Sequence, residues 1–221
     1  MNNNTVILGC SSLKEYVEEA QRKAGTDYPA IYMSRIYHRD PEEMREHLRE
    51  ALGNMPDEVQ TVLIAMGYCG GSWEELTFRG TLVIPRIDDC VSLLLQDSDE
   101  PRSDLKEKGH LYVRHKDPAK ESFKAIFDRL AEGLDEETRE RYHRDWQEMY
   151  SSIDIMDTGI NGSREPEYVR EVSKDAKWLD AELRFVKAGT YVLEKLLKGE
   201  WDDQFLVLGP EETVTKEDVL I

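Results

Sequence analysis

The first half of this chain alternates short β-branched runs with amphipathic segments, and this rhythm constrains the fold more than any other feature. Buried-strand patterns occur at residues 5–9, 30–33, 61–66 and 81–85, each followed by a helical pattern or a turn. Strands joined through helices need crossover connections, which make neighbouring strands parallel. The pattern predicts an α/β fold with a mostly parallel, doubly wound sheet, helices on both faces and a helix-rich C-terminal half.

The second half is expected to contain more helix than strand. Helical spacing predicts helices from Asp117 and from about Asp135, and one long helix over residues 167–198 that breaks or ends near Gly189 and Gly199. Short strands are expected at 110–113, 153–156 and 205–208. The chain is therefore expected to form a single α/β domain over 1–221, with a sheet-rich half, 1–116, and a helix-rich half, 117–221, as a sub-division.

Charge and hydropathy restrict the partners of this chain. Its formal net charge of -17 repels phosphate backbones and anionic lipid surfaces, so nucleic acid and membranes are not expected partners. The sequence contains no apolar run of about 18 residues, the length that spans a bilayer. The N-terminal residues 1–4 lack the basic start and apolar stretch of a secretory signal. A cytoplasmic protein is expected.

Three cysteines lie where predicted strands end. Cys10 directly follows the first strand, Cys69 lies in a glycine-rich turn after the third, and Cys90 begins the helix after the fourth. The carboxyl ends of parallel strands share one edge of the sheet, and ligands bind at that edge in such folds. We therefore expect the three thiols to meet at one end of the sheet.

The local setting of these cysteines favours the thiolate form. Cys10 and Cys90 lie at predicted helix N-termini, whose free N–H groups and partial positive charge stabilise an anion. Gly70 and Gly71 allow backbone N–H groups beside Cys69 to approach a bound cluster or anion. Three thiolates suit zinc, copper(I) or an iron–sulfur cluster. A metal centre held by the three cysteines is therefore predicted.

The cysteine pattern leaves a plainer alternative open. An odd number of cysteines in a chain without a secretory signal argues against a disulfide framework. The sequence contains no CxxC pair, and its cysteine spacing matches no ordinary ferredoxin or zinc-finger pattern. Two buried cysteines that act as small hydrophobic residues, with one incidental thiol, would also explain the spacing.

Several motifs around the cysteines belong together. They read Leu8-Gly9-Cys10, Gly67-Tyr68-Cys69-Gly70-Gly71 and Pro85-Arg86-Ile87-Asp88-Asp89-Cys90, the last opening a leucine-rich helix. With these motifs the chain resembles the DUF1638 family of proteins of unknown function over nearly its whole length. The resemblance implies that the three cysteines are the family's functional set. Family members often accompany corrinoid-dependent methyltransferase systems, which implies a context in anaerobic one-carbon metabolism.

Other polar residues of the same rim are secondary candidates for binding or orienting a ligand. Arg86 can pair with an acidic ligand or with Asp89, which can in turn cap the helix at Cys90. His38, just beyond the second strand, is the best candidate for a nitrogen ligand, although an exposed loop histidine is the simpler interpretation. Tyr68 lies in the glycine-rich turn. Asp157 can reach the same crevice or form an ordinary turn.

These observations support several hypotheses about function. The leading one is a metalloprotein whose three cysteines bind an iron–sulfur cluster of the four-iron type, for an enzymatic step or for electron delivery in anaerobic metabolism. A three-thiolate zinc enzyme for thiol or methyl transfer is the first alternative. A non-catalytic accessory protein of a corrinoid methyltransferase system and a metal-free thiol nucleophile are further ones. The expected partner is a small-molecule substrate, or a redox or methyltransferase protein.

Overall fold

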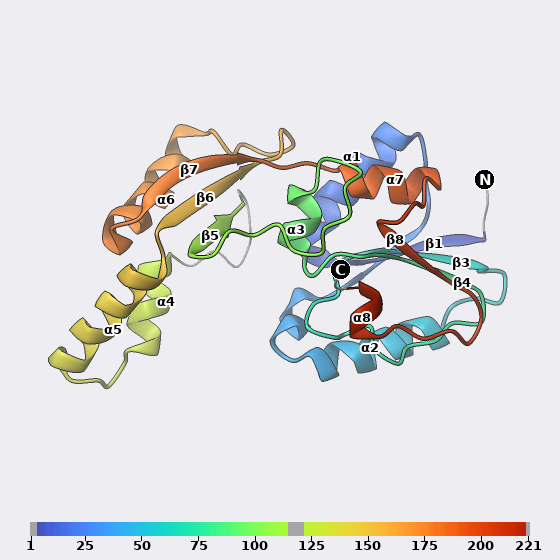
Figure 1. Ribbon diagram of the computed structural model, residues 1–221, viewed down its shortest axis with the longest axis horizontal. Coiled ribbons are helices and arrows are strands. Elements are labelled where there is room, and N and C mark those ends of the chain that lie inside the picture. The colour runs from blue at the N-terminus through green and yellow to red at the C-terminus, as the bar shows by residue number, and fades with distance from the viewer. Residues whose placement is uncertain (1–3, 115–121, 220–221) are drawn as a thin grey trace. The chain divides into compact units, whose positions relative to one another are not determined.

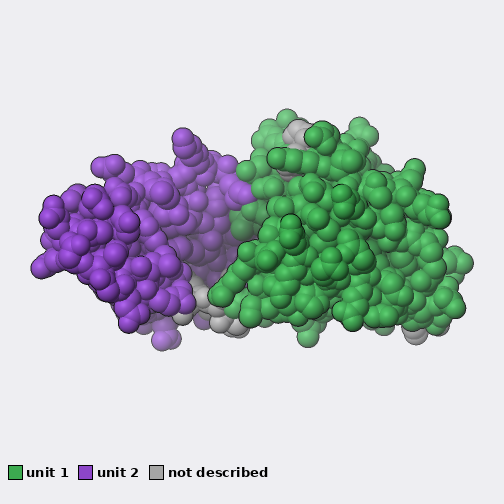
Figure 2. All heavy atoms as spheres, turned by 90° about the horizontal axis from the view of Figure 1, so that it is seen from below, with its two compact units in different colours: residues 1–105, 189–221 green, residues 106–188 purple. Residues whose placement is uncertain are grey.

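Two compact units make up the chain (Figure 2). The computed structural model describes residues 4–114 and 122–219. The first unit comprises residues 1–105 and 189–221, and the second comprises residues 106–188. The units differ in extent from the expected halves, because the C-terminal segment returns to the first unit. One domain over the whole chain stays a prediction.

Among the described residues, five strands form the sheet of the first unit, in the order β2-β1-β3-β4-β8. They are β1 (Thr5–Cys10), β2 (Ala30–Met33), β3 (Thr61–Ala65), β4 (Thr81–Pro85) and β8 (Phe205–Leu208). The first four are mutually parallel, and β8 pairs antiparallel with β4. After their first residue, β3 and β4 are buried throughout, as strands covered on both faces are. The expected α/β fold with a mostly parallel sheet is confirmed.

Helices cover both faces of this sheet (Figure 1). They are α1 (Lys14–Ala24), α2 (Pro41–Gly53), α3 (Cys90–Leu95), α7 (Tyr191–Lys198) and α8 (Lys216–Val219), with short 3-10 helices η1 (Ser11–Leu13) and η2 (Arg35–Arg39). α1 packs against α7 on one face, and α2 lies on the other. The chain moves from β1 outward to β2 and then back across β1 to β3. Right-handed crossovers in opposite directions place α1 and α2 on opposite faces.

Local signals set the ends of these helices. The Asp40 carboxylate accepts hydrogen bonds from the backbone N–H groups of Glu42 and Glu43, and Pro41 occupies the first turn of α2. Gly25 ends α1 in the left-handed region, with φ of 69°.

The second unit has a parallel sheet of its own, in the order β5-β6-β7. Its strands are β5 (His110–Val113), β6 (Ser152–Asp157) and β7 (Glu182–Lys187), and its helices are α4 (Phe123–Leu130), α5 (Glu136–Met149) and α6 (Pro166–Leu179). Ile153 and Ile155 on β6 form its core with Val172 and Leu179 on α6. α5 begins after Asp135, whose carboxylate accepts from Thr138 N–H, as expected. The helix start expected at Asp117 lies outside the described residues.

The prediction of one long helix over residues 167–198 is wrong. α6 ends at Leu179, because Asp180 adopts a left-handed conformation with φ of 53°. The segment that follows forms β7 and pairs along its whole length with β6, and only then does α7 begin. Phe185, inside the predicted helix, is a strand residue with 38% of its surface exposed. Tertiary pairing outweighed the local helical pattern here.

None of the helices in the described part of the chain combines the length and the apolar character needed to cross a lipid bilayer.

Candidate metal centre

Cys10 is the last residue of β1 and is fully buried. It is also the N-cap of η1, because its sulfur accepts a hydrogen bond from Ser12 N–H at 3.4 Å. The Ser12 hydroxyl lies 3.0 Å from the same sulfur. A thiol thus takes the cap position, which points the sulfur at the carboxyl edge of the sheet.

Cys90 is the first residue of α3, directly after the N-cap Asp89. One Asp89 carboxylate oxygen accepts from Val91 N–H at 3.0 Å and from Ser92 N–H at 2.8 Å. Asp89 therefore takes the capping role that was one of its two predicted roles. The Cys90 side chain is buried, with 8% of the residue exposed.

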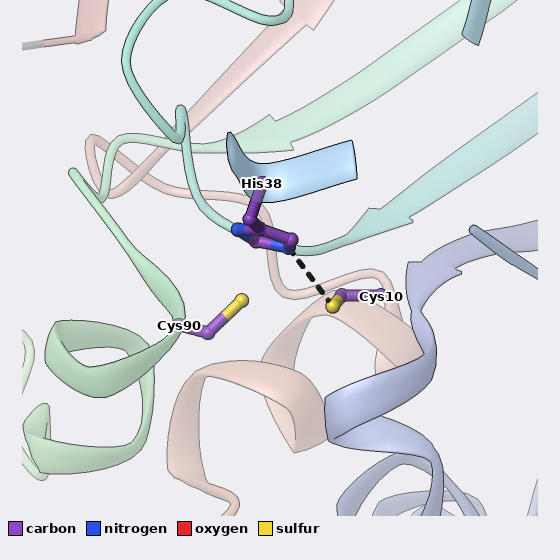
Figure 3. Close-up of side chains that lie close together, drawn as sticks. All are labelled: Cys10, His38 and Cys90. Carbon is purple, nitrogen blue, oxygen red and sulfur yellow. Dashed lines mark hydrogen bonds between the residues drawn. The ribbon is translucent and has the colours of Figure 1, made fainter. Parts of the chain in front are cut away.

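His38 joins these two cysteines from η2, the short helix after β2. Its Nε2 lies 3.1 Å from Cys10 Sγ, across 28 residues of sequence. The ligand atoms of Cys10, His38 and Cys90 all lie within 4.8 Å of one another. Figure 3 shows both sulfurs and the imidazole directed toward a common space. The thiols are buried, whereas His38 is exposed.

Cys69 reaches the same region but lies outside this compact group. Its backbone N–H donates to Asp88 O at 2.7 Å, and the preceding Tyr68 N–H donates to Ile87 O at 2.8 Å. These bonds fasten the turn after β3 to the segment before α3, and the Cys69 thiol is near enough to Cys90 to raise its pKa. The structure thus brings Cys10 and Cys90 together, with His38 in the compact group in place of Cys69.

The electrostatics of the two buried thiols favour the protonated form when no metal is bound. The hydrogen-bonded Cys90 thiol and burial raise the pKa of Cys10 to about 12, against opposing bonds from His38 and Ser12. The bond from Cys10 lowers the pKa of Cys90, but the Cys69 thiol and burial outweigh it and raise that pKa to about 12. The predicted helix N-terminal effect does not produce free thiolates here, so a metal must displace the thiol protons.

The remaining predicted residues lie in varied surroundings. Gly70 and Gly71 have φ of 72° and 99° in the turn beside Cys69. Tyr68 is buried, and its hydroxyl donates to Glu74. Arg86 Nε is buried without a hydrogen-bond partner among the described residues. In the second unit, the Asp157 carboxylate accepts from Ser163 at 2.7 Å and Arg164 at 2.6 Å, and these bonds lower its pKa.

Sequence reasoning missed two contributors near the cysteines. Ser12 supports Cys10 through its hydroxyl, and the signal for it was its place two residues after a strand end. Arg45 donates to the carbonyl of Gly71 from α2 at 2.8 Å. No local pattern marks Arg45, because a helix-surface arginine is ordinarily solvated.

The donor set fits a single metal ion. Metal–sulfur bonds of about 2.3 Å and metal–nitrogen bonds of about 2.0–2.1 Å place tetrahedral donors about 3.6–3.8 Å apart. The Cys10–His38 separation of 3.1 Å is about half an ångström shorter than the sulfur–nitrogen spacing of about 3.6 Å. Two thiolates and one imidazole suit zinc and other soft or borderline metals. These three residues could therefore bind a metal.

Comparison with known families then places the chain. A family model described as a protein of unknown function (DUF1638) matches residues 32–197. The chain belongs to the DUF1638 family. The matched region of this DUF1638 protein includes His38, Cys69 and Cys90, and begins after Cys10. Searches of curated proteins and of solved structures found no match.

Proposed function

We propose that this DUF1638 protein is a metalloprotein that binds one transition-metal ion, with zinc the best fit, through Cys10, His38 and Cys90. The observation that carries the proposal is the grouping of these three donor atoms within 4.8 Å. The donors come from the end of β1, from η2 and from α3, which share the carboxyl edge of the sheet only after folding. Zinc binds thiolate and imidazole donors in tetrahedral sites.

The spacing of the donors supports one ion over a four-iron cluster. In such a cluster each cysteine binds a different iron, so its cysteine sulfurs lie farther apart than the donors of a single ion. The compact group of Cys10, His38 and Cys90 has the narrower spacing of the single-ion case. We therefore prefer zinc to the iron–sulfur cluster, which was the leading hypothesis from the sequence.

An iron–sulfur cluster is the second candidate, because the backbone of Cys69 is hydrogen-bonded to Asp88, two residues before Cys90. Cys10, Cys69 and Cys90 would supply three thiolates, the ligand count of a cluster with one iron left open. Formation of a cluster would require the sulfurs to separate. Iron and acid-labile sulfide in the protein would favour this candidate.

The exposure of the donors suggests how the centre works. The two thiols are buried and the imidazole is exposed, so a ligand or substrate approaches from the His38 side. Bound zinc would supply Lewis acidity that lowers the pKa of a coordinated thiol or water. Ser12, bonded to Cys10, holds that sulfur in place. The proposal includes a small-molecule thiol or methyl donor as the substrate. It also includes a role in anaerobic one-carbon metabolism.

Metal analysis of the purified protein tests the proposal. The chain is prepared without oxygen or chelators, alongside Cys10→Ser, His38→Gln and Cys90→Ser variants. His47→Gln is the matched control, because His47 lies in the same unit and stacks on Tyr37 rather than on the cysteines. About one zinc ion per chain is expected in the wild type and control, with loss in the three variants. A wild-type protein with fully reduced thiols and no bound metal would reject the proposal.

A further inference from the structure

The turn that carries Cys69 has an unusual backbone. Cys69, Gly70 and Gly71 have successive φ values of 51°, 72° and 99°. Glycine adopts this left-handed region freely, whereas a residue with a Cβ pays about 1–2 kcal/mol for it. Such a conformation persists only where surrounding contacts hold it, and such positions cluster at functional sites.

A pair of charged side chains holds both ends of this turn. Arg45 Nη2 on α2 donates to Gly71 O at 2.8 Å, and lies 3.4 Å from Glu74 Oε2. The other Glu74 oxygen accepts a hydrogen bond from the Tyr68 hydroxyl. Tyr68 directly precedes Cys69, and Gly71 follows it by two residues. The Arg45–Glu74 pair therefore braces the turn on both sides of Cys69.

The Arg45–Glu74 brace is partly shielded from water, unlike the Glu46–Arg49 ion pair of α2. The Arg45 and Glu74 side chains are 20% and 36% exposed, and Tyr68 is 3% exposed. Arg49 and Glu46, one turn along α2, are 48% and 72% exposed. Exposed pairs contribute little, whereas hydrogen bonds to charged groups gain strength as water is excluded. The brace is therefore the pair on α2 that can fix a backbone conformation.

We propose that Arg45 and Glu74 are positioning residues of the metal centre, which hold Cys69 beside Cys90 so that its thiol takes the fourth position on the ion. This inference rests on the proposed function. When Arg45 or Glu74 is replaced, the backbone at Cys69 relaxes out of the left-handed region, and the thiol moves away from Cys90. The ion then keeps its bonds to Cys10, His38 and Cys90 and loses one thiolate.

Cobalt substitution in the full-length protein tests this proposal. Co²⁺ alone is the probe, because its thiolate-to-metal charge-transfer absorption grows with the number of thiolates bound. Glu74→Gln and Arg45→Met should each lower this absorption by about one third, from three thiolates to two, with unchanged cobalt stoichiometry. Cys69 in the cobalt-loaded variants should react about tenfold faster with iodoacetamide, measured by peptide mass spectrometry, because metal binding no longer protects it.

Matched controls separate positioning from general stability. Glu46→Gln and Arg49→Met remove the exposed pair of the same helix, and should leave the absorption and the alkylation rate of Cys69 unchanged. Arg45→Lys keeps the charge and should recover part of the absorption. In a Cys69→Ser background, Glu74→Gln should have no further effect on cobalt affinity, because the two changes act through one thiol.

Three results would overturn the inference. Glu74→Gln with wild-type absorption and slow Cys69 alkylation would show that the brace does not set the thiol. Equal loss of cobalt affinity in the wild-type and Cys69→Ser backgrounds would show that the brace acts on the fold. If the wild type binds no metal, the proposed function fails. The positioning of Cys69 by the brace is then tested in the metal-free protein, where Glu74→Gln should still speed alkylation of Cys69 but not of Cys10; no such difference would overturn the inference.

Discussion

Gly67 lies so close to the backbone of Asp89 that a Cβ on Gly67 would stand 2.5 Å from Asp89 Cα. Real Cβ atoms do not come this close to backbone, and no flexible side chain is available to yield. This approach presses the turn that carries Cys69 against the start of α3, where Cys90 lies. The absence of a side chain at Gly67 is therefore a condition for the grouping of the thiols.

Gly67→Ala is expected to damage both stability and metal binding. The added methyl group must push the turn away from Asp89, and overpacking of this kind costs about 1–3 kcal/mol. Urea denaturation with and without zinc measures the free energy of unfolding, and chelator competition measures zinc affinity. Gly53→Ala is the matched control, because a Cβ at Gly53 meets no described atom within 4 Å. A Gly67→Ala protein as stable and as zinc-binding as the wild type would contradict this account.

Zinc should stabilise the folded chain by mass action. An ion that binds only the folded state at about 100 times its dissociation constant adds about 2.7 kcal/mol to the free energy of unfolding. Thermal melts with added zinc and with excess chelator measure the effect. The stabilisation should vanish in Cys90→Ser, whose donor set lacks one buried thiol. An equal shift in wild type and Cys90→Ser would place the zinc elsewhere.

Lys195 on α7 is a buried cation on which the first unit depends. Its Nζ lies 2.5 Å from Asp99 and 2.7 Å from Gln204, and it also pairs with Asp202. Removal of one partner of a buried ion pair lowers the free energy of unfolding by about 3–5 kcal/mol. Because both carboxylates here are partly exposed, we expect Lys195→Met to lower it by about 2 kcal/mol.

Urea denaturation measures the effect of Lys195→Met, with the exposed Lys198→Met on the same helix as the control. Lys198→Met should leave the free energy of unfolding within about 0.5 kcal/mol of the wild type. Equal effects of the two substitutions would show that the buried ion pairs contribute nothing.

Trp178 should stabilise the second unit without affecting the metal centre. Its ring stacks on His143 with centroids 4.3 Å apart, and it also contacts Phe127 at 5.1 Å. Trp178→Ala should lower the free energy of unfolding of the second unit by about 3 kcal/mol. Zinc affinity should not change, because all of the proposed ligands belong to the first unit. Denaturation followed by circular dichroism and a zinc titration measure the two quantities. Loss of zinc binding in Trp178→Ala would contradict this assignment.

The sequence predicted the features of the first unit that depend on local patterns. Apolar runs rich in β-branched residues in β3 and β4 mark buried parallel strands. Cys10 ends β1, Cys69 lies in the turn after β3, and Cys90 begins α3. His38 was a candidate ligand from its place after β2. Its contact with Cys10 depends on the parallel register that pairs Cys10 with Met33, which no local pattern specifies.

Features that depend on distant contacts could not be predicted in this way. β7 was mistaken for helix because Trp178, Phe185 and Leu193 follow one another at helical spacing, and only pairing with β6 selects the strand. The Arg45–Glu74 brace joins residues 29 apart, and neither residue has a distinctive neighbour in the sequence. The position of Cys69 outside the compact ligand group likewise depends on contacts between distant residues, because its turn is hydrogen-bonded to Ile87 and Asp88.

X-ray absorption at the zinc edge of the zinc-loaded protein tests the central claim most directly. The account predicts a sulfur shell at about 2.3 Å and one imidazole nitrogen at about 2.0–2.1 Å, with the nitrogen signal lost in His38→Gln. A spectrum with only oxygen and nitrogen neighbours, unchanged in Cys10→Ser and Cys90→Ser, would contradict it.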